Sequence, residues 1–159
     1  MRALYVADTE AAVALAAAGT AKTIFGVKAD AGHGVDLLKW WVSLDGATAA
    51  EKPVLVELCE ATWATNAPGT NSTAVSVDQA AGPTLPETFA AARNWTAEPT
   101  VLTPLETFDL DPYKGFYSYE FPLGDSPDSL AGEGFCVRMT IPTGGAVVNA
   151  RAGMRWARV

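Results

Sequence analysis

Near the C-terminus, apolar and polar side chains alternate with a period of two, and this alternation constrains the fold more than any other sequence feature. One side of the first run carries Phe135, Val137, Met139 and Ile141, and the other carries Cys136, Arg138 and Thr140. In the second run, one side carries Val148, Ala150, Ala152, Met154 and Trp156, and the other carries Asn149, Arg151, Gly153 and Arg155. This period is typical of a strand with one buried face. Because the Gly-rich turn 142–145 separates the runs, we predict a β-hairpin with one buried and one solvent-facing side.

Five earlier segments carry further strand signals. They contain β-branched and aromatic residues and are separated by turn-forming residues such as Asp45-Gly46. The segments are 20–28, 35–44, 54–62, 101–110 and 116–121. A chain of 159 residues has the usual length of one domain with a two-layer core. We therefore predict a single all-β domain over residues 1–159, a jelly-roll-like antiparallel β-sandwich of about eight strands.

Segment 35–44 contains two adjacent tryptophans, which strict alternation assigns to opposite faces. The predicted core face carries Asp36, Leu38, Trp40, Val42 and Leu44, and the outward face carries Leu37, Lys39, Trp41 and Ser43. We interpret Leu37 and Trp41 as neighbours on the outward face and predict that Trp41 makes a subunit contact.

Two segments have ambiguous patterns. Residues 8–18 fit a short helix, because Asp8 or Thr9 can cap it and alanine favours helices, but they also fit an irregular leading strand. The uniform β pattern elsewhere favours the strand. Residues 64–86 are rich in Thr, Asn, Gly, Ala and Pro, with a weak strand signal at 73–77. We predict a long exposed loop or arm at 64–86 and an N-terminal arm at 1–10.

The charge content bears on partners. Charged residues make up only 18% of the chain, against about 25% in typical soluble proteins, which fits either a buried subunit interface or an ordinary Ala- and Gly-rich protein. The net charge is −7, which argues against a nucleic-acid groove. The longest apolar stretch, 11–19, is too short to span a membrane, and acidic residues precede it, unlike a secretory signal.

The residues that commonly perform catalysis are sparse. His33 is the only histidine and lies in a glycine-flanked loop, where we interpret it as a solvent-exposed residue. Cys59 and Cys136 lie in apolar runs, which favours two buried reduced thiols over one disulfide. Glu57 and Glu60 would face opposite sides of a strand, which does not suit a pair of catalytic acids. Asp109-x-Asp111 could contribute to a calcium site, although solvated strand-end acids explain it as well. We predict no enzyme activity and no cofactor or metal.

The tryptophans and arginines suggest contact surfaces. The chain has five tryptophans, and interfaces are enriched in Trp and Arg. The predicted interface residues are Leu37, Trp41, Trp63, Trp95, Arg151 and Arg155. Exposed aromatic rings on β-sandwiches also stack on sugars, so a carbohydrate-binding module that recognises a host glycan is the alternative.

Several segments together resemble one family of short proteins. They are Ala21–Lys28, Val42–Gly46, Pro53–Glu57, Asn94–Thr100 and Asn149–Trp156. The sequence Thr-Ala-Glu-Pro-Thr, 96–100, and the terminal Trp156 are the most distinctive parts. The chain is similar over nearly its whole length to virion structural proteins of tailed bacteriophages that infect actinobacteria.

The resemblance implies a role in the virion. It implies a capsid decoration (cement) protein that is made in the bacterial host cytoplasm and bound to the outer surface of the phage head. The implied partners are the major capsid protein and copies of the chain itself, as a dimer or trimer. A tail or fibre subunit is the alternative location. We expect no nucleic acid and no membrane among the partners.

Overall fold

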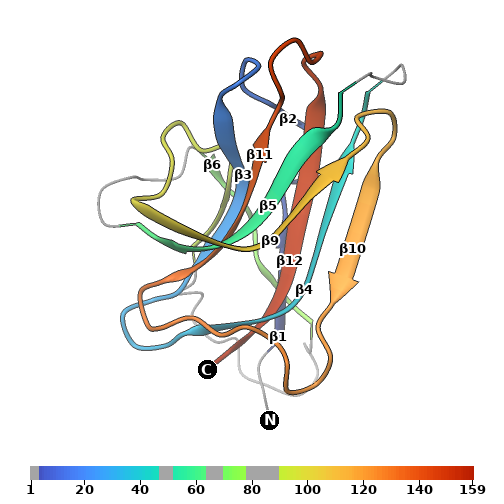
Figure 1. Ribbon diagram of the computed structural model, residues 1–159. Helices are drawn as coiled ribbons and strands as arrows, with labels where there is room; N and C mark the ends of the chain where they lie inside the picture. The colour runs from blue at the N-terminus through green and yellow to red at the C-terminus, as the bar shows by residue number, and fades with distance from the viewer. Residues whose placement is uncertain (1–3, 47–51, 64–69, 78–89) are drawn as a thin grey trace.

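The computed structural model describes residues 4–46, 52–63, 70–77 and 90–159. These residues form twelve β-strands and no helix, in two antiparallel sheets of six strands each (Figure 1). The predicted all-β sandwich is thus confirmed at this level.

Sheet A has the strand order β10-β4-β12-β1-β7, with β2 paired to β12. Its strands are β1 (Leu4–Asp8), β2 (Val13–Ala14), β4 (Val35–Leu44), β7 (Val75–Ser76), β10 (Phe116–Glu120) and β12 (Asn149–Arg158). Sheet B has the order β6-β8-β3-β11-β5-β9. Its strands are β3 (Ala21–Lys28), β5 (Val54–Thr62), β6 (Thr70–Asn71), β8 (Ala90–Arg93), β9 (Val101–Leu110) and β11 (Gly134–Thr140).

The inner faces of the two sheets supply one hydrophobic core. Trp40 of β4 and Trp156 of β12 come from sheet A, and Phe25 of β3 and Phe135 of β11 come from sheet B; all four are fully buried. The sequence alternation thus reports the buried side of each strand, and burial of these side chains is the main force that holds the sheets together.

The prediction of a C-terminal hairpin is wrong. β11 pairs with β3 and β5 in sheet B, whereas β12 pairs with β4, β1 and β2 in sheet A. The connection 141–148 therefore carries the chain from one sheet to the other. Val137 and Met154 both still point into the core, because they approach it from opposite sheets. Alternation alone fits a hairpin and a sheet crossing equally well.

The position assigned to Leu37 is also wrong. The register between β4 and β12 shifts so that Trp156 pairs with Leu37 and Arg155 pairs with Lys39, which leaves Leu38 as an extra residue. This β-bulge reverses the alternation within β4. Leu37 is consequently fully buried in the core, and Leu38 is only half-buried.

The N-terminal residues belong to the sandwich. Leu4–Asp8 form β1, which lies between β12 and β7 in sheet A, so these residues are not an arm. Segment 8–18 contains the short strand β2 and no helix. Of the expected loop 64–86, only residues 70–77 are described. They contain β6 in sheet B and β7 in sheet A, and the rest of this prediction lies outside the described residues.

Candidate functional site

Three of the six predicted interface residues lie together on the outer face of sheet A. Trp41 on β4 is opposite Gly153 on β12, and Arg151 and Arg155 are two residues to either side of Gly153. Because residues two apart on a strand share a face, all three side chains point away from the core. We call this surface the Trp41 face, formed by Asp8, Lys39, Trp41, Ser43, Phe116, Ser118, Glu120, Arg151, Gly153 and Arg155.

The Trp41 indole packs directly over Gly153. A Cβ atom on Gly153 would lie 2.1 Å from Cζ2 and 2.5 Å from Cε2 of Trp41, so only glycine leaves room for the ring. The indole rests against the backbone of β12 and remains half-exposed. A large aromatic side chain held in one position at the centre of a sheet face suits contact with a partner.

The Trp41 face carries charges of both signs. The basic side chains are Lys39, Arg151 and Arg155, and the acidic ones are Glu120 and Asp8, the β1 partner of Gly153. Lys39 and Arg155 are direct cross-strand partners, and like charges at such positions repel. Glu120 offsets part of this charge, since its Oε2 lies 3.8 Å from Lys39 Nζ. Arg155 Nε is buried and has no hydrogen-bond partner among the described residues. Arg151 donates to the carbonyl oxygen of Glu10 at 3.2 Å. The face therefore presents a half-exposed indole surrounded by charged side chains of both signs.

The other two predicted tryptophans lie on the outer face of sheet B, where they are buried. Trp63 follows β5 and Trp95 follows β8, and their ring centroids are 6.3 Å apart. They cover a small second hydrophobic cluster with Cys59, Cys136, Ala61 and Ala92. Leu37, Trp63 and Trp95 therefore offer little side-chain surface to a partner.

The edge where β9 and β10 lie holds a group that the sequence analysis missed. Glu106 of β9 lies beside an aromatic cluster in which Phe108 contacts Trp40 and Tyr117. The Tyr117 hydroxyl donates to Glu106 at 3.5 Å. Partial burial raises the pKa of Glu106, and the Tyr117 contact offsets this in part. The pKa of Tyr117 is also raised, mainly by burial and to a smaller extent by the nearby Glu106 charge. β9 and β10 belong to different sheets, and the approach of their side chains at this edge, which strand alternation does not specify, creates the site.

These two edge strands also expose large apolar side chains. Val101 and Leu105 of β9 and Phe116 and Tyr119 of β10 are exposed. β9 is the last strand of sheet B and β10 is the last strand of sheet A, so each has one edge unpaired within the described residues (Figure 1). Unpaired strand edges with apolar side chains are common sites of association.

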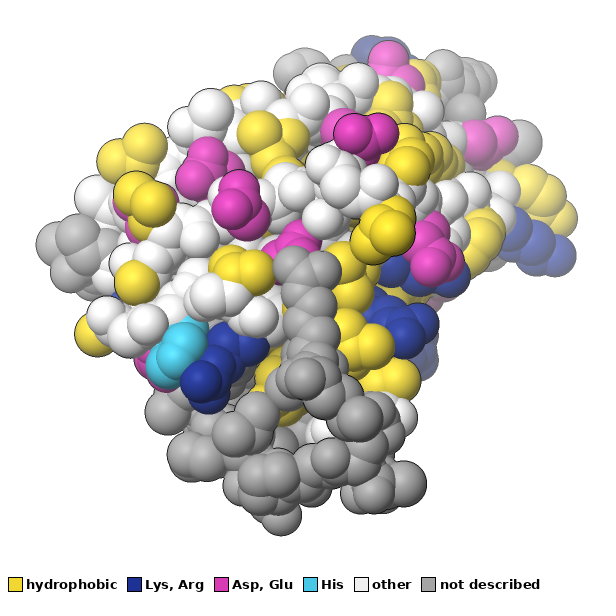
Figure 2. Space-filling model, turned by 90° about the horizontal axis from the view of Figure 1, so that it is seen from below, with side chains coloured by type: hydrophobic (Ala, Val, Ile, Leu, Met, Phe, Trp, Pro, Cys, Tyr) yellow, Lys and Arg dark blue, Asp and Glu magenta, His cyan; other side chains and the backbone are white. Residues whose placement is uncertain are grey.

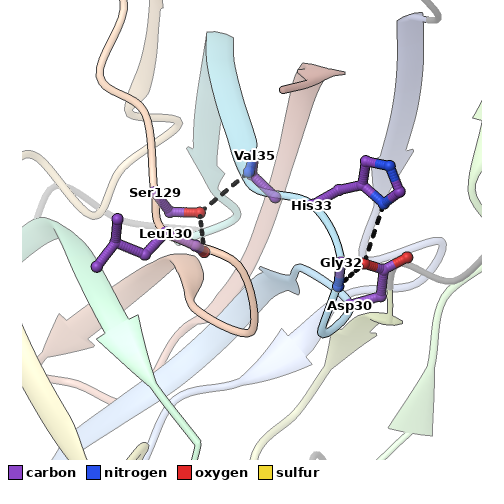
Figure 3. A network of polar contacts seen from close by, with 6 residues as sticks. All are labelled: Asp30, Gly32, His33, Val35, Ser129 and Leu130. Carbon is purple, nitrogen blue, oxygen red and sulfur yellow. Dashed lines mark hydrogen bonds and ion pairs between the residues drawn. The ribbon is translucent and has the colours of Figure 1, made fainter.

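His33 belongs to a network that supports a loop. Its Nδ1 lies 3.3 Å from Asp30 Oδ1, which also accepts a hydrogen bond from the Gly32 amide at 2.7 Å (Figure 3). In the same view, Ser129 Oγ accepts from the Val35 amide at 3.0 Å, and the His33 ring points toward Asp30 and away from Ser129. His33 is half-exposed, at the end of the sandwich where basic, acidic and apolar side chains are intermixed (Figure 2).

Glu57, one of the acidic residues considered for chemistry, forms an ion pair with Arg138. Glu57 is held by Arg138 in a two-point contact, with Nε–Oε2 at 2.8 Å and Nη2–Oε1 at 3.0 Å. This pairing raises the pKa of Arg138. Within the described ranges, no three His, Cys, Asp or Glu side chains gather as a metal site would require, and no helix is long and apolar enough to cross a membrane.

Comparisons with protein-family models, curated proteins and solved structures found no match to this chain.

Proposed function

We propose that this chain is a non-enzymatic virion structural protein, a jelly-roll capsid decoration protein that binds the major capsid protein on the outer surface of a tailed-phage head. The single observation that carries the proposal is the convergence of Trp41, Arg151 and Arg155 on one sheet face. The sequence resemblance described above supplies the kind of particle. The repeated crossing of the chain between sheets, as from β9 to β12, supports the jelly-roll assignment.

The Trp41 face has the composition of a binding surface. Tryptophan and arginine are the residues most enriched among interface positions that dominate affinity. The Arg155 side chain is half-exposed, so its guanidinium could contact a carboxylate or backbone carbonyl of the capsid protein. Binding only to the assembled shell would stabilise that shell through linkage.

Self-association as a dimer or trimer would use the other unpaired surface. The exposed Val101 and Leu105 of β9 and Tyr119 of β10 would be covered in an oligomer. These three residues lie outside the Trp41 face, so one copy could contact both the shell and a neighbouring copy.

The test is co-sedimentation of purified chain with capsid shells from phage that lack it. We expect the wild-type chain to bind, and Trp41→Ala and Arg155→Ala each to weaken binding at least about tenfold, as interface centres do. Thr107→Ala, an exposed position on the outer face of sheet B, is the matched control and should bind normally. A wild-type chain that is strictly monomeric and leaves shells unbound would refute the decoration role.

The carbohydrate-binding alternative is favoured by one specific observation, the half-exposed Trp41 indole held against Gly153. The same variants distinguish sugar binding from capsid binding. If the wild-type chain binds a glycan array but not shells, and Trp41→Ala loses the glycan binding, the Trp41 face binds a sugar. The array should remain blank if the Trp41 face binds capsid protein.

A further inference from the structure

Cys59 and Cys136 are directly opposed on the outer face of sheet B. They are Cα partners in the antiparallel pairing of β5 with β11, and both are free and fully buried. Opposed residues in such a pair have Cα atoms about 4.5 or 5.5 Å apart, depending on the hydrogen-bonding position. Disulfides span Cα separations of about 4.4 to 6.8 Å. The backbone therefore already holds the two cysteines within disulfide reach.

A short segment covers the two thiols. We call residues 94–100 the strap, because they run from β8 to β9 over the outer face of sheet B. At one end, the Trp95 amide donates to Thr23 O at 3.1 Å, and at the other, the Thr100 amide donates to Thr62 O at 2.8 Å. Between them, Glu98 accepts from the amide and the hydroxyl of Thr23, each at 2.7 Å.

Trp95 projects from the strap toward the cysteines. Its Cη2 atom lies 3.0 Å from the position that a Cβ on Gly26 would take, and Gly26 is the β3 partner of Cys136. The thiols therefore lie one side-chain layer below the surface, under an indole that the strap holds in place. A small molecule needs only a local opening of the strap to reach them, and not the unfolding of the main core.

The two thiols differ in their surroundings. The pKa of Cys59 is lowered, mainly because the Cys136 thiol donates to its sulfur and further because the Arg138 guanidinium is near. The pKa of Cys136 is raised, mainly by burial. Cys59 is thus the group of the pair that ionises first, and thiolate is the nucleophilic form of cysteine.

We propose that Cys59 and Cys136 are a dithiol oxidation site, at which a peroxide converts two thiols into an intrachain disulfide between β5 and β11. Cys59 thiolate attacks one oxygen of hydrogen peroxide, the O–O bond breaks, and the departing hydroxide leaves as water with the proton that Cys59 released. Cys59 is then a sulfenic acid. The Cys136 sulfur displaces the sulfenic hydroxyl, the S–S bond forms, and a second water leaves with the Cys136 proton. The thiols lose two electrons and two protons, and the peroxide is reduced to two waters.

This proposal is independent of the proposed function, because it uses the opposite face of the sandwich. The test treats reduced, folded chain with stoichiometric hydrogen peroxide and follows the intact mass, the thiol content in denaturant and the peptide map. We expect a mass loss of about 2 Da, the loss of both titratable thiols, a Cys59–Cys136 cross-linked peptide and full reversal by dithiothreitol.

Cys59→Ser and Cys136→Ser are matched controls, and neither should show the mass loss. Three results would overturn the proposal: oxygen added to either wild-type cysteine without a cross-link, a disulfide only between chains, or thiols that react only after the chain is unfolded. Each is visible in the wild-type chain, so the test does not depend on whether a serine variant folds.

Discussion

The packing of Trp41 over Gly153 allows a test of the Trp41 face that does not need a partner. Gly153→Ala places a methyl group 2.1 Å from the Trp41 Cζ2 atom, so the indole must move off β12. A tryptophan side chain buries about 150–250 Å², and at about 25 cal/mol per Å² a half-buried indole contributes about 2 kcal/mol. Displacing the indole would lose most of this burial free energy. Replacing a strand glycine by alanine offsets the loss by about 0.5–1 kcal/mol.

We therefore expect Gly153→Ala to cost at least about 1 kcal/mol of unfolding free energy in the wild-type chain. In a Trp41→Ala background the clash with the ring is absent and the close contact with Asp8 Cβ remains, so the same substitution should cost about 1–1.5 kcal/mol less. This difference is the coupling between the two positions. The Asp8 Cβ, 2.9 Å from the new methyl, is present in both backgrounds and cancels in the cycle.

The four chains of this cycle are compared by urea unfolding followed by far-ultraviolet circular dichroism, because Trp41→Ala alters the fluorescence. Gly32→Ala, whose new methyl would lie 3.4 Å from Asp30 Oδ1, is a control outside the face. Equal costs of Gly153→Ala in both backgrounds would show that the indole does not rest on Gly153. Trp41 would then not be a fixed side chain at the centre of the face.

Two further predictions concern the bulge in β4 and the edge carboxylate. Leu37→Ala should lower the free energy of unfolding in urea by about 2–5 kcal/mol, because Leu37 lies in the core. Leu38→Ala should lower it by less than about 1 kcal/mol. The reverse order of the two costs would contradict the bulge. Since burial raises the pKa of Glu106 above its ordinary value of 4.5, the stability linked to this group is present at low pH and is lost as pH rises through the raised pKa. Glu106→Gln should therefore raise the thermal midpoint at pH 7, with the difference from wild type vanishing below about pH 4; a lower midpoint at pH 7 would contradict this.

The sequence predicted where strands lie better than how they pair. The ranges 35–44, 54–62 and 101–110 coincide with β4, β5 and β9, because each is bounded by turn residues and consists of residues that favour strands. Pairing is different, since any two strands with one apolar face can supply opposite walls of the same core. The crossing at 141–148 therefore had no local signal that distinguished it from a hairpin.

Only part of the candidate site was predicted, because the placement of its residues depended on alternation alone. Trp41, Arg151 and Arg155 were placed outward by alternation, and this placement holds because no bulge intervenes between Trp41 and the end of β4. The bulge reversed Leu37, and one extra residue in a strand has no sequence signature of its own. Trp95 was missed as a buried residue because the strap that carries it is not a strand, and alternation does not apply to it.

The two outer faces of the sandwich differ in how they are covered, and this difference bears on orientation. On sheet B, the strap and two tryptophans bury the apolar positions within the chain itself. On sheet A, Trp41 stays half-exposed and Lys39 faces Arg155. A surface whose apolar side chains are already buried gains little from a partner, whereas a half-exposed, fixed indole gains burial. A shell-bound copy should therefore turn sheet A toward the capsid and sheet B toward solvent, which would leave the Cys59–Cys136 pair on the side that an external oxidant meets first.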